Sequence, residues 1–262
     1  MVVLGEIVAF LDRFAPSRLA ESWDNVGLLV GDSGVAVERV MTCLTITPST
    51  AAEAVRQGAQ LIISHHPLPF SALKRITDET TVGRLLLQLI RAGVAVASPH
   101  TAFDSAAEGI NQALAEGLGL VEIAPLIPHP EGEGTGRFGV LPQPMTLESV
   151  ARSAMRFLKI ATVQVVGRPT LQVHRLAIGC GAAGELLASA IDRQCNAMLL
   201  GETRFHTCLE SEAREMGLVV AGHFATERFA VERLAGVLAA QFPTLEVWAS
   251  CDEQDPLRWI VA

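Results

Sequence analysis

Short apolar runs alternate with segments of helical periodicity along most of this 262-residue chain. The clearest runs are residues 61–63, 94–97, 197–200 and 218–221, each of a length typical of a buried strand. The segments between them place apolar residues at helical spacing. Strands that alternate with helices in this way predict an α/β fold with mainly parallel sheets.

A stretch rich in proline and glycine, residues 125–144, interrupts the alternation. Such a composition favours a linker or loop, and it predicts a domain boundary near residues 127–135. A chain of this length also fits two modest domains. We expect a discontinuous α/β domain, residues 1–127 plus 218–262, and a second, smaller α/β domain, residues 128–217.

The amino-acid composition limits the classes of function that this chain can have. The chain has 20 Lys and Arg against 28 Asp and Glu, a net charge of −8. Indiscriminate nucleic-acid binding depends on neutralising phosphates, so this balance argues against it, whereas a cation site is compatible with it. Five scattered cysteines indicate reduced thiols in a cytoplasmic protein. The sequence shows neither a signal peptide nor an apolar run of membrane-spanning length.

Ser64-His65-His66-Pro67 ends the apolar run at residues 61–63. Adjacent side chains on a strand point to opposite faces, but that constraint lapses where the strand stops, and Pro67 disfavours helix for His66. Both imidazoles can then face the crevice at the carboxyl end of the strand, where open α/β sheets bind ligands. A lone histidine beside an apolar run is more often a core residue, but an adjacent pair favours a metal site.

Two further strands end in groups of the same kind. The run at residues 94–97 precedes His100 and Asp104, and the run at residues 218–221 precedes His223 and Glu227. The carboxyl ends of parallel strands lie at one edge of a sheet, so we expect these groups to converge with the histidine pair. If the last helix begins early, His223 and Glu227 share one face. Taken singly, Asp104 suits a helix cap and Glu227 a solvated first-turn acid.

The predicted metal ligands are His65, His66, Asp104, His223 and Glu227. Three imidazoles and two carboxylates exceed what one four-coordinate ion takes while keeping a water. Two divalent ions about 3.5–4 Å apart, bridged by a carboxylate and a water or hydroxide, use this set better. Nitrogen and oxygen ligands without thiolate favour zinc, manganese, iron or cobalt over calcium or magnesium.

A glycine motif offers a rival interpretation. Gly179-x-Gly181-x-x-Gly184 follows the apolar run at residues 173–178 and precedes a helix, with Glu202 downstream. This is the context of a dinucleotide fingerprint. Close packing of a helix on a strand also requires small residues, and we favour that explanation, so no nucleotide cofactor is predicted.

Glu202 and His206 follow the apolar run at residues 197–200 and leave two alternatives open. Either they face the metal crevice and handle protons or substrate, or they cap the helix that begins near residue 207. The candidates for the catalytic acid or base are His206 from this group and His100, which follows the run at residues 94–97.

Four motifs in a fixed order carry a resemblance to a known family. They are residues 22–28 (Ser-Trp-Asp-Asn-Val-Gly-Leu), 64–68 (Ser-His-His-Pro-Leu), 100–104 (His-Thr-Ala-Phe-Asp) and 222–227 (Gly-His-Phe-Ala-Thr-Glu). Over nearly its whole length the chain resembles the GTP cyclohydrolase I type 2 homologues, the Ngg-one-interacting-factor-three-like proteins. The resemblance implies two α/β domains with a dinuclear metal site, the same five ligands with Glu227 bridging, and a toroidal homohexamer.

One position departs from the family pattern. Members usually carry an aspartate in a Leu-Asp-x-Thr stretch, whereas this chain has Leu44-Thr45-Ile46-Thr47. The departure costs no predicted ligand, but it puts a supporting hydrogen bond or a substrate contact in doubt. The chain also resembles the short form, which lacks an extra domain between the halves.

The sequence hypothesis is a metal-dependent hydrolase acting on a nucleotide-like, phosphoester or amide substrate. A water that bridges two ions is deprotonated near neutral pH and attacks an electrophilic carbon or phosphorus centre. The only ground for considering GTP as the substrate is the name of the family that the chain resembles. The alternative is a non-catalytic protein that holds or delivers metal, or a ring-shaped scaffold, so the sequence leaves open whether the protein is an enzyme.

Overall fold

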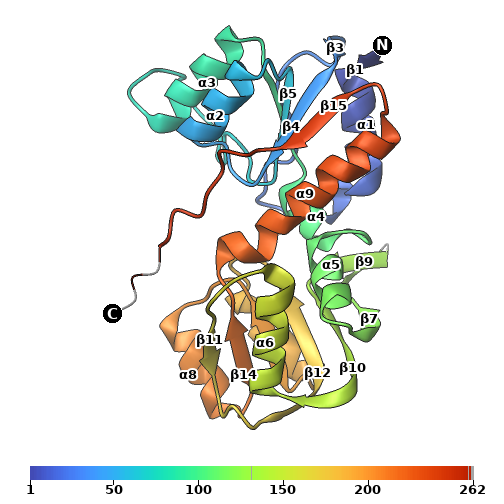
Figure 1. Cartoon of the computed structure of the whole chain (residues 1–262), viewed down its shortest axis with the longest axis vertical. Helices are drawn as coiled ribbons and strands as arrows, with labels where there is room; N and C mark the ends of the chain where they lie inside the picture. Colours follow the sequence, from blue (N-terminus) through green and yellow to red (C-terminus); the bar gives the residue numbers. More distant parts are fainter. Residues whose placement is uncertain (131, 259, 261–262) are drawn as a thin grey trace. The chain divides into compact units, whose positions relative to one another are not determined.

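The computed structural model describes residues 1–130, 132–258 and 260, and the chain forms two compact units (Figure 1). Unit 1 comprises Met1–Phe103 and Ala230–Ala262, and unit 2 comprises Asp104–Phe229. Unit 1 is thus discontinuous in sequence, with unit 2 inserted in it. The boundaries fall at residues 103/104 and 229/230, however, instead of 127/128 and 217/218.

Unit 1 is built on a five-stranded sheet in the order β15-β4-β5-β6-β2. The four strands that run parallel to one another are β15 (Glu246–Ala249), β4 (Arg39–Cys43), β5 (Leu61–Ser64) and β6 (Ala95–Ser98). The edge strand β2 (Gly27–Val30) is antiparallel, and the short strands β1 (Val2–Val3) and β3 (Ala36–Val37) pair separately. Parallel pairing therefore dominates this sheet, as predicted.

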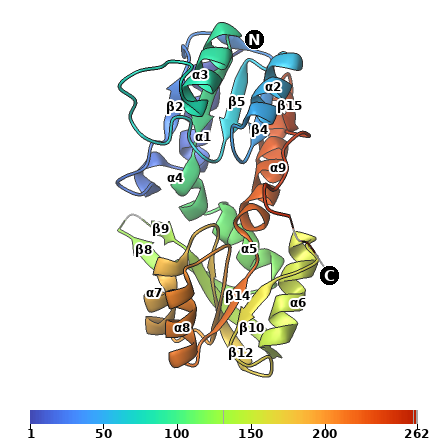
Figure 2. The same ribbon diagram turned by 90° about the vertical axis from the view of Figure 1, so that its left-hand side faces the viewer.

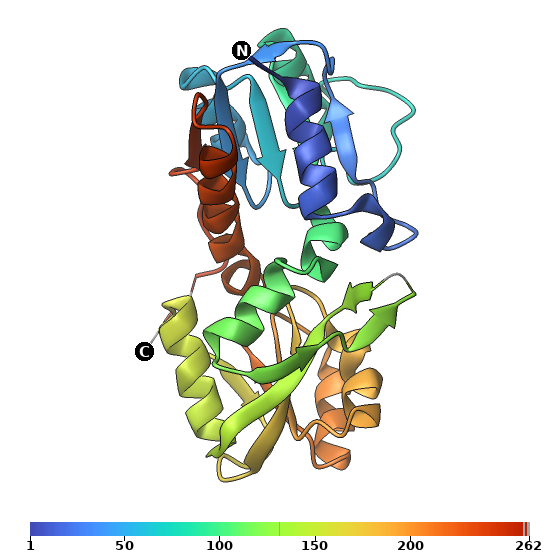
Figure 3. The ribbon, with the colours of Figure 1, turned by 90° about the vertical axis from the view of Figure 1, so that its right-hand side faces the viewer.

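Helices cover both faces of the unit 1 sheet, which is why its strands are continuous apolar runs. One face packs against α2 (Pro48–Arg56) and α3 (Thr81–Arg91) through a core that includes Met41, Ile62 and Leu86. The other face carries α1 (Leu4–Phe14) and the C-terminal part of α9 (His223–Gln241) (Figure 3). The Thr42 hydroxyl donates a hydrogen bond of 2.8 Å to the carbonyl oxygen of Val231 in α9.

Unit 2 is built on a six-stranded sheet in the order β11-β14-β13-β12-β10-β7. Its strands are β11 (Gln164–Val166), β14 (Gly217–Val220), β13 (Ala197–Leu200), β12 (Gln172–Gly179), β10 (Arg137–Thr146) and β7 (Val121–Ala124). Among the described residues, two strand pairings of this sheet are parallel and three are antiparallel. The prediction of mainly parallel pairing is thus wrong for unit 2.

The proline- and glycine-rich stretch accounts for two of the three antiparallel pairings, those of β10. Residues 125–144 do not form a linker: they contain the hairpin of β8 (Ile127–His129) and β9 (Gly132–Thr135) and most of β10. Proline cannot donate a hydrogen bond to a strand ladder. Pro142 and Pro144 lie where the register between β10 and β12 is interrupted, between Val140 and Met145, so the strand accommodates them.

Helices also cover both faces of the unit 2 sheet (Figure 2). On one face lie α5 (Ile110–Gly117) and α6 (Leu147–Leu158), and on the other α7 (Leu187–Asp192) and α8 (Phe205–Ala213). The core beneath α7 and α8 includes Ala177, Met198 and Leu218. Among the described residues, no helix combines the length and the apolar character needed to cross a membrane.

A buried carboxylate fixes the segment after β15 in unit 1. Glu53 in α2 accepts hydrogen bonds from the Ser250 hydroxyl (2.5 Å), the backbone NH groups of Cys251 (2.9 Å) and Asp252 (3.0 Å), and Trp248 Nε1 (3.2 Å). Burial alone would raise the pKa of this carboxyl group, but the hydrogen bonds, first that of Ser250, lower it below its ordinary value. The ionised form is therefore the one that the fold stabilises.

Glu53→Gln is expected to lower the free energy of unfolding at pH 7 by about 2 kcal/mol, because it replaces charge-assisted hydrogen bonds and introduces a buried NH₂ group. The native-state pKa lies below the unfolded one, so the contribution is present above the unfolded value and disappears as the pH falls through the native value. The difference from wild type should shrink in acid. Urea denaturation measures it, with the exposed Glu148→Gln as control. Equal losses for both variants would contradict this account.

Candidate functional site

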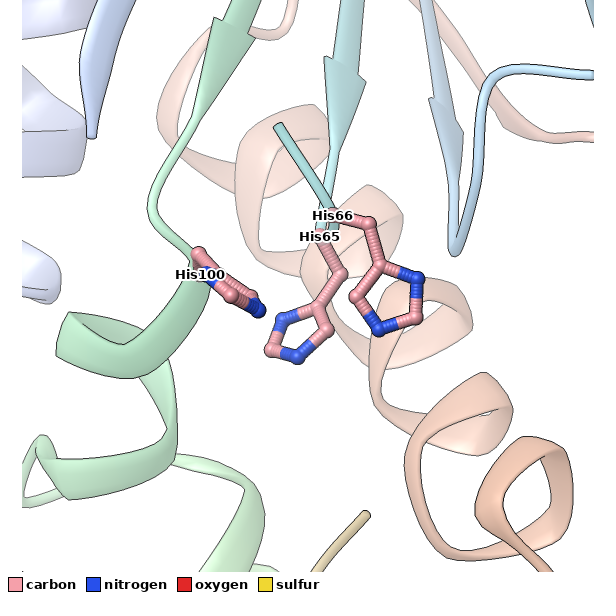
Figure 4. Close-up of side chains that lie close together, drawn as sticks. All are labelled: His65, His66 and His100. Atoms are coloured by element: carbon pink, nitrogen blue, oxygen red, sulfur yellow. The ribbon is translucent and has the colours of Figure 1, made fainter. Parts of the chain in front are cut away.

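Three histidines of unit 1 form what we call the imidazole cluster. His65 and His66 follow β5, and His100 is the first residue of α4 (His100–Ser105). One ring nitrogen of each lies within 4.8 Å of those of the other two. Ring centroids are 5.1 Å apart for His65 with either neighbour and 5.5 Å for His66 with His100, and Figure 4 shows the rings converging. The side chains of two sequence neighbours therefore do reach one cluster, as predicted.

Backbone hydrogen bonds at the end of β5 hold the histidine pair. His65 NH donates to the carbonyl of Cys43, and His66 NH donates to that of Leu44, so the ladder with β4 continues past the strand. The Ser98 hydroxyl donates to the carbonyl oxygen of His65 at 2.6 Å. The main chain stays fixed to both neighbouring strands while the two rings project to one side.

Thr45, the residue at the position of the family aspartate, contacts His66. Its Oγ1 lies 2.7 Å from His66 Nδ1. The Glu253 carboxylate accepts the backbone NH groups of Leu44 and Thr45 at 2.9 and 2.7 Å, which fixes the turn that carries the hydroxyl. The hydrogen bond that the departure put in doubt is therefore present, with a neutral partner instead of a charged one.

Asp24 holds His100. Its Oδ1 lies 2.7 Å from His100 Nδ1, and its Oδ2 accepts the backbone NH and the hydroxyl of Thr101. Burial alone would raise the pKa of Asp24, but His100 and then Thr101 lower it to about 2, so the carboxylate is ionised. The sequence favoured a turn cap for Asp24, and only the structure shows this contact. His100 has φ of 27°, a strained value that such partners stabilise.

Asp104, His223 and Glu227 of unit 2 form what we call the carboxylate cluster. Helix α9 begins at His223, so His223 and Glu227 do share a face, and Nε2 of one lies 3.0 Å from Oε2 of the other. Glu202 Oε1 lies 3.0 Å from His223 Nδ1, so of the two alternatives for Glu202 the structure favours a role beside the ligands. The hydrogen bond with Glu227 raises the pKa of His223 to about 9, against the effect of burial and with help from Glu202.

The glycine motif packs against this cluster. The Cys180 thiol donates to Asp104 Oδ1 at 3.1 Å, and Asn111 joins the same two residues by accepting the NH of Cys180 and donating to the carbonyl of Asp104. A Cβ at Gly181 would lie 2.1 Å from Glu227 Oε1. The motif therefore provides close packing, as favoured above, and what it packs against is the pair of predicted carboxylate ligands.

The prediction that all five ligands follow strands of one sheet is wrong. We expected β5, β6 and β14 to end at one edge of one sheet. Strand β14 instead pairs with β13 and β11 in the unit 2 sheet, so His223 and Glu227 come from a different sheet than His65 and His66. An apolar strand carries no sign of which neighbour it pairs with.

The structure groups His206 with residues of α7 and α8. It is exposed on α8, where it lines a groove with Asp192 of α7 and Glu210. Its role as an acid or base stays a prediction.

The chain was compared with known families, sequences and structures. The family model of Duf34/NIF3 (NGG1p interacting factor 3) matches residues 2–256. This chain belongs to the Duf34/NIF3 family. A "GTP cyclohydrolase 1 type 2 homolog" from Streptomyces coelicolor is 35% identical over 86% of this chain and 81% of its own length. One from Clostridium acetobutylicum is 29% identical over 97% of both chains. A crystal structure of a Staphylococcus aureus protein superimposes with a TM-score of 0.89, at 26% identity over 99% of both chains.

The donor atoms of this Duf34/NIF3 protein suit a divalent transition metal. Imidazole nitrogens and carboxylate oxygens are the ligands that such ions take. Histidines that bind metal usually donate their other ring NH to an oxygen, which leaves Nε2 for the ion. Three histidines have that arrangement at Nδ1: His66 with Thr45, His100 with Asp24, and His223 with Glu202. The residues of both clusters therefore fit a metal site.

In the metal-free protein, His223 is expected to titrate near pH 9 because two carboxylates stabilise its protonated ring. Glu227→Gln should lower this pKa the most and Glu202→Gln by less, since Glu227 makes the larger contribution. NMR titration of the ring protons measures it, with the His223→Gln spectrum identifying the resonance. A wild-type value near the ordinary 6.5 would contradict the ion pairs described here.

Proposed function

We propose that this protein is a dinuclear metal-dependent hydrolase. The ligands are His65, His66, Asp104, His223 and Glu227, with Glu227 bridging two divalent ions of zinc, manganese, iron or cobalt. The observation that carries the proposal is the oxygen atom held against Nδ1 of two predicted ligands, His66 and His223, which orients each ring for ligation through Nε2. A single core histidine can make such a bond for packing alone, whereas its recurrence at two predicted ligands in separate family motifs favours ligation.

The proposal requires the imidazole cluster and the carboxylate cluster to serve one centre. The continuity of the chain supports this. Helix α4 begins at His100 and contains Asp104 four residues later, a spacing that places two side chains on the same side of a helix. The order of the four family motifs supports it as well. The same resemblance is our ground for proposing a toroidal homohexamer.

Bound divalent ions would lower the pKa of a coordinated water and polarise the substrate. The residues of this chain supply the proton handling. Asp24 is ionised and holds a proton at His100 Nδ1, so His100 Nε2 is a base that can accept the proton of the attacking water and later return it to the leaving group. Glu202 orients the ring of His223 through Nδ1, and His223 Nε2 lies beside Glu227. A nucleotide-like, phosphoester or amide bond is the substrate class that this chemistry serves.

The reconstituted protein is expected to hold about two ions per chain by elemental analysis, and to turn over a member of a panel of nucleotides, phosphoesters and amides. Glu227→Ala should lose metal and activity together. His100→Asn should keep its metal and lose about 100-fold or more in kcat, because it removes the proton acceptor alone.

The exposed Glu212→Ala in α8 is the matched control for these variants and should behave as wild type. Activity that survives loss of Glu227 would overturn the hydrolase mechanism. Tight metal binding without turnover of any substrate would favour a protein that holds or delivers metal.

Thr45→Val is expected to weaken metal binding about 10-fold or more, because the valine keeps the shape of the side chain but removes the partner of His66 Nδ1. Thr45→Ser should keep near wild-type affinity. Competition with a coloured chelator measures both. Equal affinity of the valine and serine variants would show that the hydroxyl does not support the ligand.

A further inference from the structure

Two aromatic side chains lie largely uncovered beside His100. Trp23 and Phe70 are 59% and 53% exposed, and their ring centroids are 5.8 Å apart with 33° between the planes. The chain has only 13 aromatic residues, from 10 Phe, 3 Trp and no Tyr. Such rings normally contribute by burying large areas, so a neighbouring pair left this exposed calls for an explanation other than core packing.

Both rings meet the imidazole of the candidate acid or base edge to face. Trp23 lies 6.0 Å from His100 with the planes at 76°, and Phe70 lies 5.9 Å from it at 73°. The three rings thus contact one another pairwise. A ligand that covers Trp23 and Phe70 would reach the proton-handling residue directly.

The main chain holds the two rings in place independently of their packing. Asn25 Nδ2 donates to the carbonyl oxygen of Pro69 at 2.8 Å, which joins the turn that carries Trp23 to the loop that carries Phe70. Asp24, between Trp23 and Asn25, is fixed by His100 and Thr101. The same carboxylate therefore orients His100 and anchors the turn, which keeps the exposed indole at a set place beside the imidazole.

We propose that Trp23 and Phe70 form a stacking surface for a planar heteroaromatic ring of the substrate, such as a nucleobase. This rests on the proposed function and adds the substrate class to it. A ring between two others needs centroids about 7 Å apart, from two contacts of about 3.5 Å, so at 5.8 Å the ligand stacks on the outer faces of the pair. Stacking of this kind accepts any base, because each has a π face.

The test uses two probes on the metal-loaded full-length protein: guanosine 5′-monophosphate and ribose 5-phosphate, which lacks only the base. Calorimetry is expected to show that the nucleotide binds about 10-fold or more tightly, and that Trp23→Leu and Phe70→Leu each reduce this preference severalfold. Trp23→Phe should retain most of it and guards against misfolding. Phe205→Leu, at an exposed ring in unit 2, is the control and should keep the full preference.

Equal affinity for the two probes, no binding of either probe, or a preference unchanged in both leucine variants would overturn the stacking surface. The same loop also exposes Leu73 and Ile76, so solution mass is measured for every variant. A change of oligomeric state in Trp23→Leu or Phe70→Leu would assign the rings to an interface between copies and overturn the proposal. A preference for the base without turnover of any panel substrate would retain the stacking surface and overturn the hydrolase. Turnover without a preference for the base would retain the hydrolase and overturn the stacking surface.

Discussion

The whole candidate site depends on one recurring interaction, an oxygen atom held against Nδ1 of a histidine. A buried ring nitrogen without a partner costs about 1–3 kcal/mol, and a partner also decides which nitrogen carries the proton. The oxygens come from three unrelated pieces of backbone: the turn before β2, the end of β4 and the end of β13. Each of these turns has its own support, such as Glu253 beneath Thr45, so the rings are fixed by the fold and not by one another.

The electrostatic situation in unit 2 is different, because the carboxylates of Asp104 and Glu227 place two negative charges close together. Asp104 and Glu227 both act on the Cys180 thiol, whose pKa is raised first by burial and then by their two charges. The thiol is therefore neutral and donates to Asp104. The turn at Gly181 has no room for a side chain beside Glu227. Packing two carboxylates against an uncharged, tightly packed turn leaves their charge to be balanced by His223 and, in the proposed site, by a cation.

The positions of single strands and helices could be predicted from the sequence, whereas the pairing of strands and other long-range contacts could not. Apolar runs ended by Pro67 or Gly222 placed the strands, and α9 begins at His223, which fulfils the condition under which His223 and Glu227 were expected to share one face. The sheet that β14 joins could not be predicted, because a run such as residues 217–220 packs equally well beside any buried neighbour. The contact between Asp24 and His100 spans 76 positions, and a Trp-Asp-Asn sequence is equally typical of a plain turn.

Two of the oriented histidines, His100 and His66, have Nδ1 partners that differ in charge, and the difference agrees with the roles proposed for them. Asp24 is a buried carboxylate at about pKa 2, and so it can compensate a positive charge whenever His100 takes up a proton. Thr45 offers His66 only a neutral hydroxyl, which orients the ring without favouring a charge on it. A ligand must stay neutral to bind a cation, whereas an acid or base must tolerate both states. A carboxylate beside His100 therefore suits a proton carrier, and a hydroxyl beside His66 suits a ligand. At His223 the Glu202 carboxylate instead favours the protonated ring, so a cation that binds there must displace a proton.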